Sequence, residues 1–264
     1  MNKAPLGVFD SGIGGLTVAR ALFERLPQES VIYFGDTARV PYGPKSPDTV
    51  RRYSGEILAY LLQRGVKAVV VACNTSTAHA LGFLQQRSPV PVVGVIEPGA
   101  RAAVAATRTG TIGVIGTAGT IASGAYERAI KALRADARVH SQPCPLFVPL
   151  VEEGWFEHPA AELIAREYLE PLRRAQVDVL VLGCTHYPLL KPLIARVMGP
   201  EVKLVDSAEE TATVVSRELE RLGLLSNGGS HEHRFVVSDD EPHFRKVGAL
   251  FLGEKLKQVE VAPL

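Results

Sequence analysis

Two segments of the chain repeat one pattern. Residues 66–75 and 177–186 each consist of mostly aliphatic residues that lead into a cysteine and then into small polar residues. An apolar run bounded in this way predicts a buried strand. Cys73 and Cys184 therefore stand at the carboxyl ends of predicted strands, which is the edge of an open parallel sheet where ligands bind. Two equivalent thiols suggest a pair of acid/base groups that face one substrate from opposite sides.

A buried cysteine is often only a small apolar core residue. The repeated context favours a function, because the asparagine, threonine and histidine that follow these thiols are unusual in a core and can bind polar groups. Cys144 lies between two prolines and lacks this context, so we expect it to pack in the core. A redox pair of Cys73 and Cys184 is an alternative, which requires disulfide geometry in place of a gap that fits a substrate.

Strand and helix patterns alternate along the chain, which predicts parallel sheets covered by helices. In the first part we expect strands at 6–9, 31–34, 68–72 and 92–95, with helices at 16–26, 47–64 and 77–86. In the second part we expect strands at 111–115, 138–141, 179–182 and 203–205, with helices at 121–135, 160–174 and 189–198.

The two parts are similar to each other. Residues 7–11 align with residues 113–117, and the two cysteine segments align at nearly the same offset. This agreement indicates an internal duplication. Residues 207–210 form the pattern of a capping box and predict the start of a further helix.

We therefore expect an α/β fold with two pseudo-symmetric open parallel-sheet domains and an active site in the cleft between them. The first domain would comprise 1–97 and 207–264, and the second 98–206. The chain would then cross between the domains near 97–98 and near 206–207, and the two crossings would form a hinge.

Composition excludes several classes of partner. The net charge is +1 with 22% charged residues, and no run of Lys or Arg exceeds two residues, so neither nucleic acid nor an anionic membrane is indicated. No apolar stretch reaches the length of a membrane span and no signal segment precedes the first predicted strand, so we expect a cytoplasmic protein. Three cysteines without a C-x-x-C motif indicate neither a disulfide framework nor a zinc site.

Two loops follow strands at the same predicted edge as Cys73. The glycine-rich segment 10–16 is not a dinucleotide motif, because Thr17 occupies the position of the last glycine. Its backbone N–H groups still favour an anion, whereas Asp10 suits an ammonium group or a thiol. The turn-rich segment 35–44 is either a plain connection or a loop whose backbone N–H groups hold a carboxylate.

Four motifs in order resemble those of bacterial glutamate racemases, and the resemblance spans essentially the whole chain. They are Asp-Ser-Gly-Ile-Gly-Gly-Leu at 10–16, Gly-Asp-Thr-Ala-Arg-Val-Pro-Tyr-Gly at 35–43, Ala-Cys-Asn-Thr at 72–75 and Gly-Cys-Thr-His-Tyr-Pro at 183–188. The resemblance implies a cofactor-independent racemase of the aspartate/glutamate superfamily, which interconverts L- and D-glutamate and supplies D-glutamate for peptidoglycan. Glutamate is then the small-molecule substrate, no metal is needed, and association into a homodimer is left open.

The chemistry of the residues agrees with this implication. Inversion of a stereocentre needs one group that removes the α-proton and another that returns a proton to the opposite face, so a thiolate and a thiol are required together. The pKa of a free thiol, about 8.5, needs only modest tuning for this task. None of the nine lysines lies in a comparable polar cluster at a strand end, so no pyridoxal site is indicated.

The resemblance also implies roles for individual residues. Cys73 would face D-glutamate with the help of Asp10, and Cys184 would face L-glutamate with the help of His186. The implied substrate-binding positions are Asp10, Ser11, Pro41, Tyr42, Gly43, Asn74, Thr75, Thr117, Thr120, Glu152, Thr185 and His186.

Several alternatives stay open at the level of the sequence. Ser11 and Thr117 could simply cap helices, and Glu153 could take the place of Glu152. Of the seven histidines, only His186 is supported as a functional residue. The substrate could be aspartate or another acidic amino acid, or the chain could be a binding module that retains the fold without catalysis.

Overall fold

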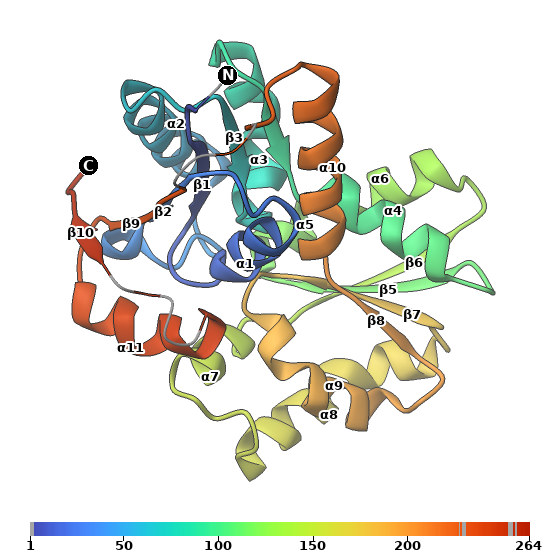
Figure 1. The fold of residues 1–264 in the computed structure, drawn as a ribbon. Helices are drawn as coiled ribbons and strands as arrows, with labels where there is room; N and C mark the ends of the chain where they lie inside the picture. The colour runs from blue at the N-terminus through green and yellow to red at the C-terminus, as the bar shows by residue number, and fades with distance from the viewer. Residues whose placement is uncertain (1–2, 227, 229–230, 253–255, 257) are drawn as a thin grey trace.

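The computed structural model describes residues 3–226, 228, 231–252, 256 and 258–264, and it contains two parallel sheets (Figure 1). The first sheet has the strand order β10-β9-β2-β1-β3-β4. Its strands are β1 (Leu6–Asp10), β2 (Val31–Gly35), β3 (Ala68–Val71), β4 (Val92–Gly94), β9 (His233–Val237) and β10 (Val259–Val261). The second sheet has the order β6-β5-β7-β8, with β5 (Thr111–Gly116), β6 (Arg138–Pro143), β7 (Val179–Gly183) and β8 (Lys203–Val205).

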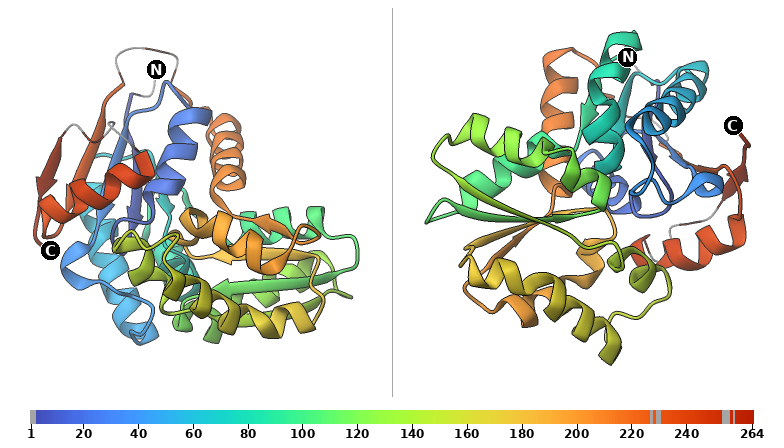
Figure 2. Two further views of the ribbon diagram at one scale, coloured as in Figure 1. Left: turned by 90° about the horizontal axis from the view of Figure 1, so that it is seen from below. Right: turned by 180° about the vertical axis from the view of Figure 1, so that it is seen from behind.

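The two sheets share one topology. In each, the first four strands of the unit lie side by side in the order second, first, third, fourth, and neighbouring strands are parallel. The predicted fold, with two pseudo-symmetric parallel-sheet units, is thus confirmed. β9 and β10 extend the first sheet beyond β2, so the C-terminal segment lies beside the N-terminal unit (Figure 2).

Helices cover both faces of each sheet. On the first sheet, one face carries α1 (Leu16–Arg25), α10 (Ala208–Arg221) and α11 (Glu241–Leu252), and the other carries α2 (Pro47–Gln63) and α3 (Asn74–Arg87). The second sheet lies between α4 (Ile96–Ala106) with α6 (Ala125–Leu133) and α8 (Pro159–Arg174) with α9 (Lys191–Met198), as Figure 1 shows. Short helical segments complete the fold: η1 (Thr37–Arg39), α5 (Ala118–Ala122), α7 (Phe147–Glu152) and η2 (Tyr187–Leu190).

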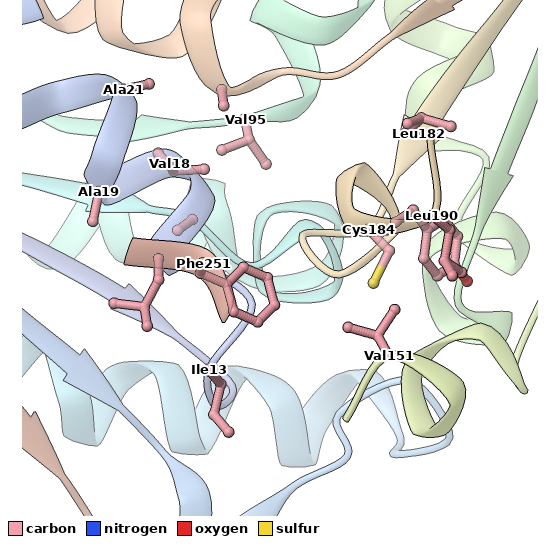
Figure 3. Close-up of a cluster of buried hydrophobic side chains, with 14 of the residues drawn as sticks. Ile13, Val18, Ala19, Ala21, Val95, Val151, Leu182, Cys184, Leu190 and Phe251 are labelled. Carbon is pink, nitrogen blue, oxygen red and sulfur yellow. The ribbon is translucent and has the colours of Figure 1, made fainter. Parts of the chain in front are cut away.

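One apolar cluster connects the two units. Because side chains alternate along a strand, Val8 of β1 belongs to this cluster whereas the next residue, Phe9, packs on the opposite face of the sheet. The cluster continues from Val18 of α1 to Leu182 of β7, and Figure 3 shows it around Cys184. Cys144 is fully buried within it, as predicted. The two units are therefore held together by a shared core.

The predicted first crossing is helical. α4 begins at Ile96 and continues through Glu97 and Pro98, where the sequence suggested the end of a unit. Proline is tolerated there because a backbone N–H in the first turn of a helix has no partner within the helix. The domain boundaries themselves stay a prediction.

One further helix prediction is corrected, and another is confirmed, as α10, without its predicted capping box. The expected helix at 121–135 is divided into α5 and α6, because Gly124 adopts a left-handed conformation with φ 64°. The expected capping box at 207–210 does not form: Ser207 makes no capping hydrogen bond, and Asp206 Oδ1 accepts one from the N–H of Ala208 at 3.0 Å. The helix α7 was not predicted, since six residues that include a proline carry too little periodicity.

A buried ion pair at the amino ends of β2 and β3 provides a test of the fold. Glu29 and Lys67 precede β2 and β3, their charged groups are 2.5 Å apart, and their side chains are 3% and 2% exposed. In Glu29→Gln the buried ammonium faces a neutral amide, so we expect the free energy of unfolding to fall by about 3 kcal/mol. The exposed pair Arg20–Glu24 supplies the control: Glu24→Gln should cost less than about 0.5 kcal/mol. Urea unfolding measures both, and equal costs for the two variants would contradict the buried pair.

Candidate active site

The two thiols lie at equivalent places in the two sheets. Cys73 follows β3 and Cys184 follows β7, and each of these is the third strand of its unit. In an open parallel sheet of this order the connections diverge between the first and third strands, so a crevice forms at their carboxyl ends. Both thiols line one cavity of about 390 Å³. All three cysteines are free thiols.

Most of the predicted site residues also line this cavity. They are Ser11, Pro41, Tyr42, Gly43, Cys73, Asn74, Thr75, Thr117, Glu152, Cys184, Thr185 and His186. Asp10 and Thr120 lie beneath the lining, buried and hydrogen-bonded to residues of the wall. The apolar part of the wall was not predicted, and it comprises Val40, Pro44, Ala118, Pro145, Val148 and Pro149.

Of the two residues that could cap helices, Thr117 does so and Ser11 does not. Ser11 caps no helix, since α1 begins after Gly15, and its hydroxyl accepts a hydrogen bond from the Cys73 thiol at 3.7 Å. Thr117 does cap α5, with its Oγ1 accepting from the N–H of Thr120 at 3.3 Å. The Thr117 hydroxyl also lies 2.9 Å from that of Thr75, so this cap is part of the contact between the two units.

Burial and a nearby carboxylate both raise the pKa of Cys73. The thiol is 5% exposed, and burial together with the charge of Asp10 raises its pKa to about 11; Ser76 and the hydroxyl of Ser11 oppose this rise, because they can donate to the sulfur once it is a thiolate. Burial also raises the pKa of Asp10, although the charge of His186 and the N–H of Gly12 oppose this effect. Asp10 therefore influences Cys73 through its charge. Cys73 carries its proton near neutral pH.

Cys184 has a cationic neighbour instead. His186 Nδ1 lies 4.0 Å from Cys184 Sγ, and its Nε2 lies 2.9 Å from Oε1 of Glu152. Burial alone would lower the pKa of His186, but its hydrogen bonds to Cys184 and Glu152 raise the pKa to about 10. Burial alone would raise the pKa of Glu152. Its hydrogen bond to His186 and the charge of that ring outweigh burial, so the pKa is lowered. The imidazole ring of His186 is thus held between Cys184 and Glu152. Glu153 is exposed and lies outside the wall.

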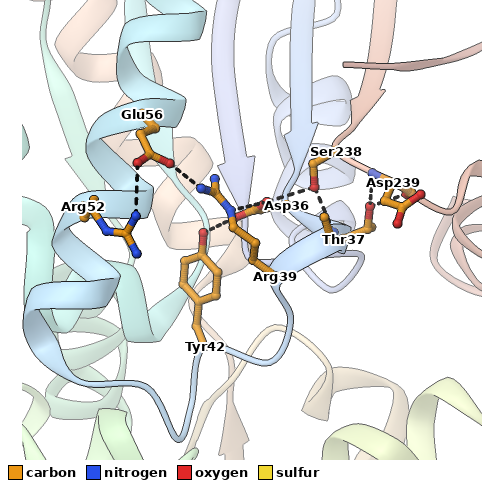
Figure 4. A network of polar contacts seen from close by, with 9 residues as sticks. Asp36, Thr37, Arg39, Tyr42, Arg52, Glu56, Ser238 and Asp239 are labelled. Atoms are coloured by element: carbon orange, nitrogen blue, oxygen red, sulfur yellow. Dashed lines mark hydrogen bonds and ion pairs between the residues drawn. The ribbon is translucent and has the colours of Figure 1, made fainter. Parts of the chain in front are cut away.

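A buried carboxylate holds the loop that carries Tyr42 and Gly43 (Figure 4). Asp36 is fully buried and accepts hydrogen bonds from Arg39 Nε at 2.7 Å, from Ser238 Oγ at 2.8 Å and from the Tyr42 hydroxyl. Burial and this carboxylate raise the pKa of Tyr42, so the hydroxyl stays a donor. No sequence pattern indicated this role of Asp36, because its partner Ser238 lies 202 residues further along the chain.

The loop also touches the second unit. The carbonyl of Gly43 accepts a hydrogen bond from the N–H of Gly119 at 2.9 Å. A Cβ at Gly43 would lie 2.8 Å from Cβ of Thr117, which is too close for any other residue at this position without a shift. The cavity is therefore closed on this side by direct contact between the units.

Within the described ranges, no group of three or more His, Cys, Asp and Glu side chains could hold a metal ion. No helix in the part of the chain that the structure describes is long and apolar enough to cross a membrane.

Comparison with known proteins assigns the family. Residues 15–215 match the family model of the Asp/Glu/Hydantoin racemases. The chain belongs to this family. It is therefore a racemase.

Individual relatives cover nearly the whole chain. A glutamate racemase from Geobacter metallireducens is 58% identical over 256 residues, which are 96% of this chain and 94% of that protein. The structure of glutamate racemase from Francisella tularensis in complex with D-glutamate has a TM-score of 0.94 and 39% identity, and the match covers 99% of this chain and 98% of that one. The structure from Thermus thermophilus in complex with beta-chloro-D-alanine has a TM-score of 0.89 and 49% identity, with the same coverage of 99% and 98%.

The pair of His186 and Glu152 predicts how stability changes with pH. The pKa of His186 is raised from 6.5 to about 10 by folding, so its contribution is complete below pH 6.5 and is lost as the pH rises towards 10. Glu152→Gln removes one of the two neighbours that raise the pKa of His186, so the pKa rises less on folding in this variant. The free energy of unfolding should therefore fall less steeply in this variant than in the wild type between about pH 6.5 and pH 9.5. Urea unfolding across this range measures the slope, with Glu153→Gln as the control that follows the wild type. Equal slopes for the Glu152→Gln variant and the wild type would contradict the assignment.

Proposed function

We propose that the protein is a glutamate racemase that uses Cys73 and Cys184 as its two acid/base groups. The observation that carries the proposal is a single cavity with one thiol from each unit, each with a different charge beside it. A buried thiol near Asp10 keeps its proton, whereas a sulfur next to the His186 imidazolium is suited to the thiolate form. A base and an acid are then present together, as inversion requires.

The reaction in one direction follows from these states. The Cys184 thiolate takes the α-proton of L-glutamate, and the Cys73 thiol gives its proton to the opposite face of the resulting carbanion to form D-glutamate. Cys184 ends as a thiol and Cys73 as a thiolate, so the reverse reaction can start from this state. His186 stabilises the negative charge while it is on Cys184, and the burial of Cys73 keeps its thiolate reactive.

Polar groups of the wall suit a dicarboxylic amino acid. Backbone N–H groups at Tyr42–Gly43 are donors for carboxylate oxygens. Glutamate is favoured over aspartate as the substrate because the relatives at 46–58% identity are named glutamate racemases, and one similar structure contains D-glutamate. A binding module without catalysis is disfavoured because both thiols line the cavity.

The wider role follows from the activity. We propose that the D-glutamate formed is used for peptidoglycan, and that the protein acts in the cytoplasm. We also propose that 1–97 with 207–264 and 98–206 are the two domains, which would close on the substrate and exclude water from the thiols.

Replacement of each thiol tests the proposal. Serine is a far weaker acid than cysteine, so Cys73→Ser and Cys184→Ser should each lower kcat by about 10³-fold in both directions without loss of the fold. Circular dichroism with L-glutamate and with D-glutamate measures the inversion. Cys144→Ser is the control and should stay active, because its hydroxyl can still donate to the carbonyl of Gln142. Full activity in either of the first two variants would exclude the two-thiol mechanism.

A further inference from the structure

Tyr126 is buried next to the cavity but outside its lining. It comes from α6 of the second unit, is 2% exposed, and its hydroxyl donates a hydrogen bond of 2.7 Å to Oδ1 of Asn74. Asn74 comes from the first unit, follows Cys73 directly, and lines the cavity. We propose that Tyr126 is a positioning residue that turns the amide NH₂ of Asn74 towards the substrate, so that Asn74 binds a carboxylate oxygen of glutamate and not its ammonium group. This inference rests on the proposed function.

The ring of Tyr126 packs closely against two glycines. A Cβ at Gly99 of α4 would lie 3.2 Å from both Cε1 and Oη of Tyr126, and a Cβ at Gly183 would lie 3.0 Å from Cε2. Contacts this close leave no room for a larger residue unless the ring moves. Gly183 immediately precedes Cys184, so the ring also packs against the backbone that carries the second thiol. The packed ring therefore keeps the hydroxyl beside Asn74, to which it donates, and beside the side chain of Ser207.

The inventory of donors and acceptors determines what Asn74 can bind. An asparagine side chain has one carbonyl oxygen that accepts and one NH₂ group that donates. Burial raises the pKa of Tyr126, so its hydroxyl stays protonated and occupies Oδ1 as a donor. The NH₂ group is left for the substrate. It matches a carboxylate oxygen, whereas an ammonium group needs an acceptor.

The tyrosine is also a link between the units. Without its hydroxyl, the Asn74 amide could turn over and present Oδ1 to the cavity, where it would repel a carboxylate. For the distal carboxylate, which takes up no charge when the α-proton leaves, the loss affects binding in the ground state and the transition state alike. Such a loss raises KM and leaves kcat nearly unchanged.

The decisive variant is Tyr126→Phe, which removes a single oxygen. We expect KM to rise about tenfold for both L- and D-glutamate, equivalent to about 1.4 kcal/mol, with a change in kcat of less than about threefold. In an Asn74→Ala background the same substitution should have no further effect on KM. Tyr60→Phe is the matched control, because this ring lies in the separate core cluster behind the first sheet, and it should leave KM unchanged. An unchanged KM in Tyr126→Phe, or a full tenfold effect in the Asn74→Ala background, would overturn the positioning role.

Glutarate, which has both carboxylates and no ammonium group, separates the two parts of the inference. Calorimetry should show that Tyr126→Phe weakens glutarate and glutamate by the same factor. A loss for glutamate alone would assign Asn74 to the ammonium group and overturn the carboxylate assignment. Because calorimetry needs no turnover, a wild type that binds glutamate but does not invert it would overturn the proposed function alone.

Discussion

Parallel pairing of the strands determines where the chemistry of this protein is placed. In each sheet the first and third strands lie side by side, and their carboxyl ends are the point at which the connections diverge. Asp10 ends the first of these strands and Cys73 follows the third in the first unit, and Thr117 and Cys184 follow the equivalent strands in the second. The shared apolar core then brings the two edges to one cavity. A fold with the same residues at the other edge would leave both thiols without a common substrate.

The two similar sheets carry two thiols with unequal surroundings. Burial and the carboxylate of Asp10 raise the pKa of Cys73, whereas Cys184 lies 4.0 Å from Nδ1 of His186. Glu152 holds the proton on His186 from the far side of the ring. The proposed mechanism needs one acid and one base at the same time, which two identical surroundings would not provide. The difference between the two neighbours is therefore as important as the likeness of the two sheets.

Local patterns predicted much of this structure, and long-range contacts account for what they missed. The strand before each thiol is a continuous apolar run, and its end locates Cys73 and Cys184 directly. The break in the helix at Gly124 and the helical crossing at Pro98 depend on the packing around them, which a periodic pattern does not contain. Asp36 and Tyr126 are further cases, because their partners are 202 and 52 residues away along the chain. Such partners become visible only when the elements are packed.

Exchange of the substrate α-hydrogen in D₂O tests most directly whether each thiol serves one face of the substrate. The racemase is given L-glutamate, and both enantiomers are separated early in the reaction and analysed by mass spectrometry. The hydrogen returned to the far face comes from Cys73, which exchanges with solvent, so the D-glutamate formed should carry deuterium while the remaining L-glutamate carries little. Starting from D-glutamate, the label should appear mainly in L-glutamate, delivered by Cys184. Equal labelling of both enantiomers at early times would show one shared base and would contradict the account.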